Sequence, residues 1–175
     1  MELVGPRVML RPWRRGDEEA LVRHANNHNV WRNLTDRFPH PYRAADARAW
    51  IRQCATQEGL PCHLAVTLAG EAVGGAGFER LPDLARLTAE IGYWLGEEHW
   101  GRGLASEALR LTTDYAFANF DFVRLQAGVL EWNPRSARVL EKAGYHLEAR
   151  LAKAVYKDGQ VIDSLLYVRL RSDGG

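Results

Sequence analysis

Residues 90–109 read EIGYWLGEEHWGRGLASEAL and carry the strongest structural signal in the chain. The alternating, largely apolar residues 87–95 predict a β-strand. Gly101 and Gly103 then lead directly into residues 104–120, whose apolar side chains recur at the period of an amphipathic helix. Glycines let backbone N–H groups approach a ligand, and the amino end of a helix adds partial positive charge. The stretch therefore predicts an anion site suited to a pyrophosphate, although similar glycine turns also serve as simple tight connections.

Further strands and helices are expected on both sides of this stretch. The expected elements before it are a strand at 7–11, a helix that begins near Asp17, a helix at 44–57 and a hairpin of strands at 62–68 and 72–78. Those after it are a strand at 123–130, a helix at 133–143, and two strands at 145–156 and 161–170. Asp17 is the expected N-cap of its helix. The strand–helix–strand order over 87–130 requires a parallel crossover, so the chain is expected to form one α/β domain over residues 1–175, with a mixed sheet of about seven strands and about four helices.

Composition excludes several classes of function. The chain has 175 residues, of which 46% are hydrophobic and 26% charged, as in an ordinary globular domain. Lys and Arg total 23 against 22 Asp and Glu, which argues against a dedicated nucleic-acid binder. The sequence contains no apolar run long enough for a membrane span and no secretory segment at its start. With only Cys54 and Cys62, both expected as reduced thiols, we expect a cytoplasmic protein with no nucleic-acid or membrane partner.

The glycine loop resembles a known motif. Residues 100–105, WGRGLA, are similar to the acyl-CoA-binding motif of the GNAT superfamily of N-acetyltransferases, Gln/Arg-x-x-Gly-x-Gly/Ala, with Gly103 and Ala105 at the two small positions. Trp100 departs from the leading Gln or Arg. A Trp-Gly-x-Gly form is familiar in the branch typified by the ribosomal-protein N-terminal acetyltransferases. The departure changes a side chain and leaves the backbone donors of the loop in place.

The likeness continues downstream. Residues 133–145, NPRSARVLEKAGY, are similar to the N-x-x-S-x-x-V-L-E-K-x-G-F block of the same branch, and residues 156–167 look like its closing hairpin. The resemblance covers about residues 7–170. It implies the GNAT α/β fold, a single mixed, mostly antiparallel twisted sheet with a splayed parallel pair at the cofactor site. Homodimers are common among such relatives.

The resemblance implies acetyl transfer from acetyl-CoA to a primary amine by direct attack in a ternary complex, without a metal. The protein then has to hold both reactants, deprotonate the ammonium, bind the developing oxyanion and protonate the thiolate. The implied phosphate ligands are the backbone of Gly101, Arg102, Gly103, Leu104 and Ala105, the Ser106 hydroxyl and the Arg102 guanidinium. A solvated loop charge is the alternative for the Arg102 side chain. The implied ligands of the oxyanion and the pantetheine arm are the backbone of Tyr93, Trp94 and Leu95, with Gly96 as the point where the strand splays away. Asn133 is expected to cap a helix and to contact the pantetheine.

Two side chains are candidates for proton transfer. The resemblance makes Ser136 the candidate acid that protonates the thiolate, because this branch has Ser or Cys where other members use Tyr. A hydroxyl that bonds its own helix backbone is the alternative, and Tyr145 and Tyr156 are weaker candidates for the acid. Glu90 is the candidate base, directly or through a water, since apolar surroundings on its strand would make the carboxylate a stronger base. An ion-paired or rim carboxylate is the alternative for Glu90.

The acceptor is open at this stage. The likeness favours the α-amine of a protein or peptide, but the branch also contains enzymes that acetylate polyamines, amino-acid-like toxins and aminoglycosides. Glu90, Glu97 and Glu98 are candidates for an acidic pocket that would suit a small polycation. A non-catalytic acyl-CoA-binding regulatory module is a further alternative. A dinucleotide-binding redox domain is excluded, because its glycine loop would follow the first strand of a repeated β-α-β series.

Two other features of the sequence lie outside the glycine-loop motif. The region of Trp31 and residues 33–42 borders the acceptor pocket in the family, and its candidate polar groups are Arg32, Asp36, Arg37, His40 and Tyr42. His24 and His28 lie four residues apart on one helix face, a spacing that metals can use. The sequence shows no third ligand beside them, so we expect surface or half-buried histidines.

Overall fold

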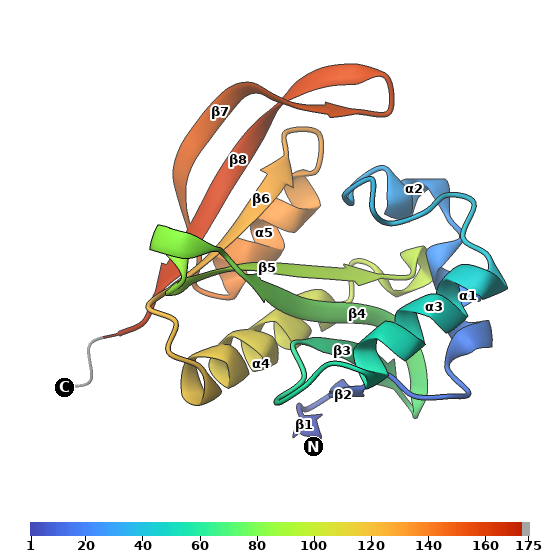
Figure 1. Cartoon of the computed structure of the whole chain (residues 1–175). Helices are drawn as coiled ribbons and strands as arrows, with labels where there is room; N and C mark the ends of the chain where they lie inside the picture. Colours follow the sequence, from blue (N-terminus) through green and yellow to red (C-terminus); the bar gives the residue numbers. More distant parts are fainter. Residues whose placement is uncertain (173–175) are drawn as a thin grey trace.

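One sheet organises the structure, a computed structural model that describes residues 1–172 (Figure 1). Within these residues the strands lie in the order β1-β2-β3-β4-β5-β6-β8-β7, and every neighbouring pair is antiparallel except β5 and β6. The strands are β1 (Leu3–Val4), β2 (Met9–Pro12), β3 (His63–Leu68), β4 (Glu71–Arg80), β5 (Thr88–Leu95), β6 (Arg124–Leu130), β7 (His146–Lys157) and β8 (Gln160–Leu170). The helices are α1 (Glu18–Ala25), α2 (His28–Trp31), α3 (Ala44–Ala55), α4 (Leu104–Asn119) and α5 (Pro134–Lys142), with 3₁₀ turns η1 (Asp83–Ala85) and η2 (Glu97–His99).

The mixed, mostly antiparallel sheet expected from the sequence is confirmed. All seven predicted strands and all four predicted helices are present, within a few residues of the predicted bounds. The structure adds β1 and α2, which contain two and four residues and are too short to produce a periodic pattern. No helix within residues 1–172 is long and apolar enough to cross a bilayer.

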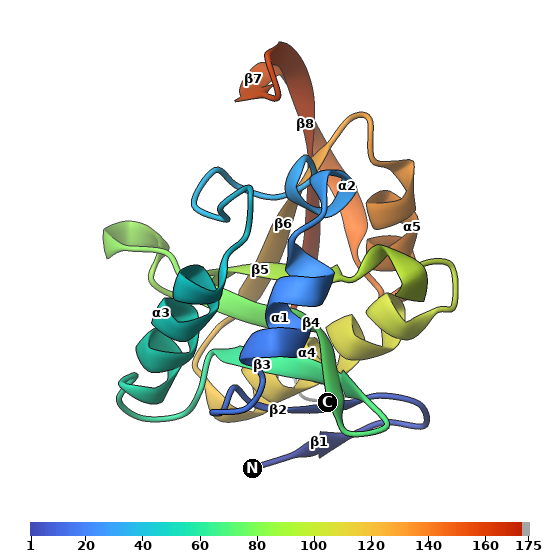
Figure 2. The same cartoon turned by 90° about the vertical axis from the view of Figure 1, so that its right-hand side faces the viewer.

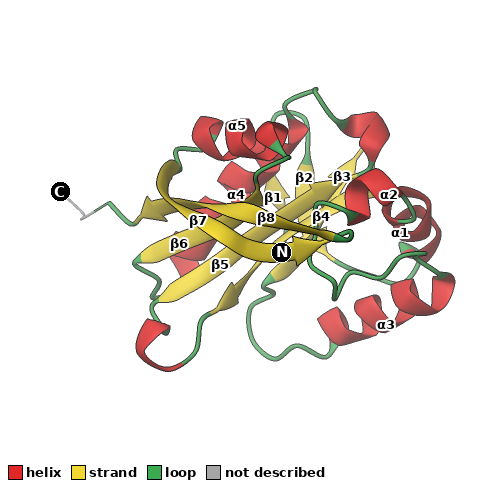
Figure 3. Ribbon diagram, turned by 90° about the horizontal axis from the view of Figure 1, so that it is seen from above, coloured by secondary structure: helices red, strands yellow, loops and turns green. Residues whose placement is uncertain are grey.

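Helices cover both faces of the central strands, which explains why β3 and β4 are apolar along most of their length. Leu64 and Val66 of β3 lie in one buried cluster with Leu109 of α4. Ala65, between them, points to the opposite face and packs in a second cluster with Leu21 of α1 and Ile51 of α3. Figure 2 shows α1 and α3 side by side, and Figure 3 shows α4 and α5 on the other side of the sheet.

The parallel pair β5–β6 separates soon after it forms. The two strands pair only at three positions, which end with Glu90 opposite Gln126. Beyond that point β5 continues along β4 and β6 continues along β8, so the strands point in different directions (Figure 1). The expectation that Gly96 marks the splay is wrong. Its N–H bonds to the carbonyl of Val73 on β4, and the separation begins several residues earlier.

The start of α1 is held by a buried ion pair and not by a side-chain cap. Asp17 is the N-cap residue of α1, as expected, but its carboxylate makes no cap hydrogen bond. Instead it accepts two hydrogen bonds from the Arg11 guanidinium, each 2.8 Å long, and one from the backbone N–H of Arg14 at 3.0 Å. Both side chains are buried. The pair therefore ties β2 to the beginning of α1.

We expect Arg11→Ala to lower the free energy of unfolding by about 3–5 kcal/mol, because it leaves the Asp17 carboxylate buried without a partner. Urea denaturation of the purified chain measures this change. Arg37→Ala is the matched control, since Arg37 pairs with Glu79 where both side chains are exposed, and such a pair contributes about 0–1 kcal/mol. Equal losses of unfolding free energy in the two variants would contradict a stabilising role for the buried Arg11–Asp17 pair.

Candidate functional site

A cavity of about 670 Å³ lies at the carboxyl end of β5, between the amino end of α4 and α5. It brings together two segments that are far apart in the sequence, the glycine loop and the start of α5. The sequence-predicted residues that line it are Tyr93, Trp94, Leu95, Gly101, Gly103, Leu104, Ala105, Ser106, Asn133 and Ser136. Arg102 and Glu90 do not line it.

The glycine loop has a backbone conformation that other residues rarely adopt. Gly101 and Gly103 have φ angles of +74° and +76°, in the left-handed region. A Cβ atom at Gly103 would lie 3.1 Å from the Arg7 guanidinium, which is closer than ordinary contact. Trp100 fixes the start of the loop by donating its indole N–H to the carbonyl of Leu95 at 2.9 Å. Conformation thus favours glycine at both positions, and space does so at Gly103 alone, since a Cβ at Gly101 would meet nothing within 4 Å.

Arg7 and Glu107 hold the outer side of this loop. The Arg7 guanidinium donates to the carbonyls of Arg102, at 2.6 Å, and Gly103, at 3.3 Å. The buried Glu107 carboxylate accepts from Arg7 Nε at 2.9 Å and from the backbone N–H groups of Arg7 and Val8. Burial raises the pKa of Glu107, but these hydrogen bonds outweigh burial and lower it, so the carboxylate stays ionised. The pair was missed in the sequence because its partners are far apart along the chain.

The amino end of α4 is left open toward a ligand. Gly103 is its N-cap, and no side chain in the described structure caps it. The first N–H groups of a helix lack partners within the helix and favour an anion. With the loop carbonyls engaged by Arg7, the N–H groups at the amino end of α4 form a cradle that fits a phosphate group.

The Arg102 side chain does not reach this cradle. It is exposed, and its Nη1 lies 3.4 Å from Nδ1 of His99. Three basic side chains that were not singled out in the sequence line the cavity from α5 instead, namely Arg135, Arg138 and Lys142. Their spacing of three and four residues places them on one helix face, and this spacing was the signal that could have found them.

We expect Arg138→Glu to weaken acetyl-CoA binding by about 10–100-fold, the value of a lost charge-assisted hydrogen bond. The difference in acetyl-CoA affinity between the variant and the wild-type protein should become smaller as salt is added, because salt screens partly exposed charges. Calorimetric titration of acetyl-CoA at two salt concentrations measures both effects. Arg48→Glu, an exposed charge reversal on α3 outside the cavity, is the control. An effect of the same size in the control would assign the loss to net charge alone.

Ser136 and Tyr93 form a hydroxyl pair inside the cavity. Asn133 caps α5 by accepting from the backbone N–H of Ser136, as expected for the cap. The Tyr93 hydroxyl lies 2.7 Å from Ser136 Oγ and 3.1 Å from the Ser136 carbonyl oxygen. Burial raises the pKa of Tyr93 above its usual value, despite the opposing effect of the hydrogen bond to Ser136, so the phenol keeps its proton. When the phenol donates to Oγ, the serine proton is free for an acceptor in the cavity.

The alternative acids lie elsewhere. Tyr145 is buried in the core, where its hydroxyl is 2.8 Å from Thr113 Oγ1, and burial raises its pKa to about 12. Tyr156 is 69% exposed on β7. Neither residue lines the cavity, so Ser136 is the hydroxyl best placed among the three.

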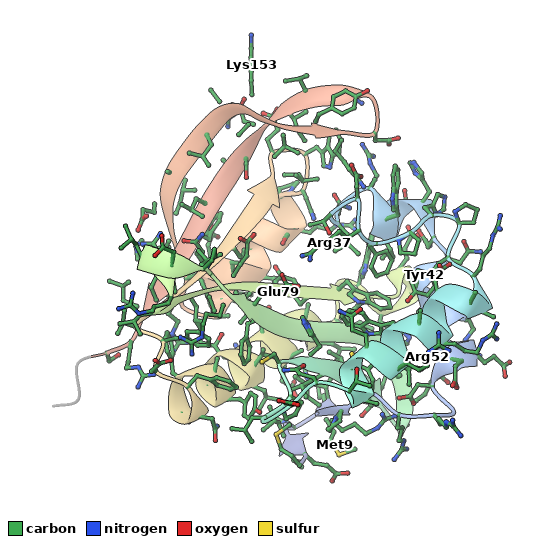
Figure 4. The ribbon with its side chains drawn as sticks, in the orientation of Figure 1. Met9, Arg37, Tyr42, Arg52, Glu79 and Lys153 are labelled. Atoms are coloured by element: carbon green, nitrogen blue, oxygen red, sulfur yellow. The ribbon has the colours of Figure 1, made fainter. Side chains whose placement is uncertain are left out.

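Of the two alternatives for Glu90, apolar surroundings or a rim position, the structure shows the rim position. On β5, Ala89 and Ile91 point into the core, whereas Glu90 is exposed on the opposite face. Directly across the ladder lies Glu79, which pairs with Arg37 at 3.0 Å (Figure 4). Cross-strand partners share a face of the sheet, so this face carries two carboxylates at the end of β5 away from the cavity. Glu97 and Glu98 lie at the other end of β5, so the three glutamates do not form one acidic pocket.

The predicted acceptor region is organised around Trp31. The Trp31 ring stacks on His40, and the ammonium of Lys157 lies 3.7 Å from its centroid. Lys157 also donates to Asp36 at 2.8 Å, which ties the tip of the β7–β8 hairpin to the segment after α2. Val30, Asn33 and Leu34 of this region line the cavity. Tyr42 does not contribute a polar group, because it is buried against α1 and α3.

Comparisons with known proteins agree with these features. A family model described as an acetyltransferase (GNAT) domain matches residues 7–146. The probable N-acetyltransferase YjcK of Bacillus subtilis is 46% identical over 43% of this chain and 44% of its own length. The ribosomal-protein-serine acetyltransferase of Escherichia coli is 34% identical over 57% of this chain and 55% of its own. The chain thus spans about half the length of these curated relatives. The structure of Mycobacterium smegmatis RimJ in complex with CoA-disulfide has a TM-score of 0.81 at 25% identity, over 93% of this chain and 81% of that one.

Proposed function

The chain belongs to the GNAT family of acetyltransferases, and from this premise we propose that it transfers the acetyl group of acetyl-CoA to the N-terminal α-amine of a protein or peptide. The observation that carries the proposal is the cavity beside β5. One space of about 670 Å³ is lined by a helix amino end open to an anion, a basic helix face and a serine hydroxyl. The first two groups suit the phosphates of acetyl-CoA and the serine hydroxyl suits its thioester, while the backbone of Tyr93, Trp94 and Leu95 in the same cavity suits the pantetheine arm.

Each part of acetyl-CoA has residues suited to it. The backbone N–H groups at residues 103–106 would bind the pyrophosphate, and the basic side chains on α5 would add charge. The backbone of Tyr93, Trp94 and Leu95 faces the gap that opens where β5 leaves β6, which leaves room for the arm to lie along the strand. An N–H group of this segment would also bind the oxyanion.

Ser136 would protonate the departing thiolate. Its hydroxyl lies in the cavity, and Tyr93 is in place to donate to Oγ as the serine proton leaves. This pairing lowers the barrier to proton loss from a group that is by itself a weak acid. Tyr93 acts here through Ser136 and is a positioning residue.

We propose Glu90 as the base, acting on the amine through water because the carboxylate lies outside the cavity and is exposed. We expect Glu90→Gln to lower kcat/KM for the amine by about 10²-fold, the lower end of general-base contributions. Initial rates measured over a range of amine concentrations give this kcat/KM. Glu148→Gln, an exposed carboxylate on β7, is the control. An unchanged rate in Glu90→Gln would mean that solvent removes the proton without this carboxylate.

A second acceptor class is favoured by one observation. Glu79 and Glu90 lie opposite each other on one exposed face of the sheet, and two neighbouring carboxylates attract a cation such as a polyamine. The peptide acceptor is supported instead by the similarity to a ribosomal-protein-serine acetyltransferase. We place the peptide first because Arg37 already neutralises Glu79.

A thiol-release assay with acetyl-CoA over a panel of amines tests the proposal. The panel contains peptides with different N-terminal residues, polyamines, amino acids and aminoglycosides, and calorimetric titration of acetyl-CoA runs in parallel. Thiol release with peptides alone supports the proposal, and release with polyamines alone supports the second class. Binding without release for any amine would favour a regulatory acyl-CoA-binding module. A chain that does not bind acetyl-CoA would overturn the transferase function.

A further inference from the structure

Two histidines and a glutamate converge just before the glycine loop. His24 comes from α1, while Glu98 and His99 belong to η2. One ligand atom from each residue can be chosen so that all three lie within 4.8 Å of one another. Glu98 Oε1 is 3.2 Å from His24 Nδ1 and 3.7 Å from His99 Nε2. A tetrahedral zinc ion with bonds of about 2.0–2.1 Å separates its ligand atoms by about 3.4 Å, so the two distances from Glu98 match such a centre.

The orientation of His24 is set by a second carboxylate. His24 is buried, and its Nε2 lies 2.8 Å from Glu71 Oε1, which also accepts from Arg23. The other ring nitrogen, Nδ1, faces the Glu98 oxygen at 3.2 Å. With a metal ion bound at Nδ1, Glu71 would accept the proton of Nε2 and hold the ring in place. A carboxylate that orients the distal ring nitrogen is the usual outer partner of a metal-bound histidine.

His99 supplies the third atom. Its Nε2 is buried and has no hydrogen-bond partner among the described residues. Coordination through Nε2 would place the ring proton on Nδ1 and would break the 3.4 Å contact with Arg102. That contact is long for a hydrogen bond, so little is lost by breaking it.

We propose that His24, Glu98 and His99 bind one zinc ion, with water in the fourth position. Two imidazoles and a carboxylate are a donor set that suits zinc. An open pocket of about 390 Å³, lined by Arg23, His24, Asn27, Glu97 and Glu98, gives the ion a path to two of the three ligands, while His99 lines the cofactor cavity.

The ion would have a structural or regulatory role and no part in the acetyl transfer. It would join α1 to η2, whose last residue, His99, lies two positions before Gly101 and lines the cofactor cavity. Zinc would thereby fix the turn that leads into the glycine loop. This inference does not depend on which amine is acetylated.

Zinc titration by calorimetry of the full chain, after removal of metals with a chelator, tests the site. We expect one zinc ion per chain, and cobalt in its place should show the visible absorption of a tetrahedral centre. His99→Gln should abolish binding, and Glu71→Gln, which removes only the outer carboxylate, should weaken it by about 10–100-fold. His146→Gln, an exposed histidine on β7, is the matched control and should bind like the wild-type protein.

Folding is checked by the thermal melt of each variant without metal. Should His99→Gln unfold, Glu98→Gln repeats the test at a side chain that is 66% exposed, and it should weaken zinc binding by more than tenfold. The proposal is overturned if the wild-type chain binds no zinc, or if the folded variants bind it as the wild type does. It is also overturned if the ring NMR signals of His24 and His99 stay unchanged on adding zinc, since the ion would then bind elsewhere.

Discussion

We expect Gly103→Trp to abolish acetyl-CoA binding and transfer while the chain stays folded. The residue has a φ of +76°, which costs a residue with a side chain about 1–2 kcal/mol, a loss that a domain of ordinary stability survives. The larger effect is local. A side chain there meets the Arg7 guanidinium at 3.1 Å and would push it off the carbonyls of Arg102 and Gly103. The loop would then lose the geometry that exposes its N–H groups to the phosphates.

Calorimetric titration of acetyl-CoA and a urea melt of the same sample measure the two parts of this expectation. Gly59→Trp is the matched control, because Gly59 has a φ of +78°, open space around its Cβ direction and no place in the cavity. It introduces the same backbone strain without touching the loop, so it should bind acetyl-CoA normally. If Gly103→Trp kept its affinity for acetyl-CoA, the assignment of the phosphate loop would be wrong.

The second large effect is expected for Ser136→Ala, which should lower kcat by about 10²–10⁴-fold, the range of general-acid contributions. The variant removes only the hydroxyl that lies 2.7 Å from Tyr93. The helix cap is kept, because Asn133 accepts from the backbone N–H of this residue. The affinity for acetyl-CoA should therefore change by no more than about threefold, so that the loss lies in the chemical step.

Single-turnover rates with a saturating amine, together with the acetyl-CoA Kd, separate the two effects. Ser164→Ala removes a hydroxyl outside the cavity and serves as the control. Tyr93→Phe should reproduce part of the kcat loss, because Ser136 would lose its donor. Equal losses of kcat and of acetyl-CoA affinity in Ser136→Ala would make the serine a binding residue and not the acid.

Local sequence signals predicted most of the fold. The 3.6-residue period of residues 104–119, the glycines before them and the Asn-Pro start of α5 depend on interactions within a few residues. These signals gave bounds close to those observed. The glycine loop was also predicted as an anion site, because glycines let backbone N–H groups approach a ligand, and that role stays a prediction.

Exposure was harder to predict, since it depends on what covers a strand. Alternation along β5 correctly put Glu90 on the face opposite Ile91. Whether that face is buried is set by elements distant in sequence, and the structure leaves it open to solvent. Of the two alternatives for Glu90, the structure therefore agrees with the rim carboxylate, and Tyr42, predicted as a polar group near the acceptor, packs in the core.

The sequence by itself thus determined most of the elements, the mixed sheet and the place of the glycine loop before α4, because each rests on short-range periodicity or on the conformational freedom of glycine. Only the tertiary structure decided which side chains meet. Arg7 reaches the loop through Glu107, Tyr93 meets Ser136, and His24 finds its partners in η2 and not in His28. Such contacts form when the sheet brings distant segments together, and no pattern along the chain records a distance between residues separated by tens of positions.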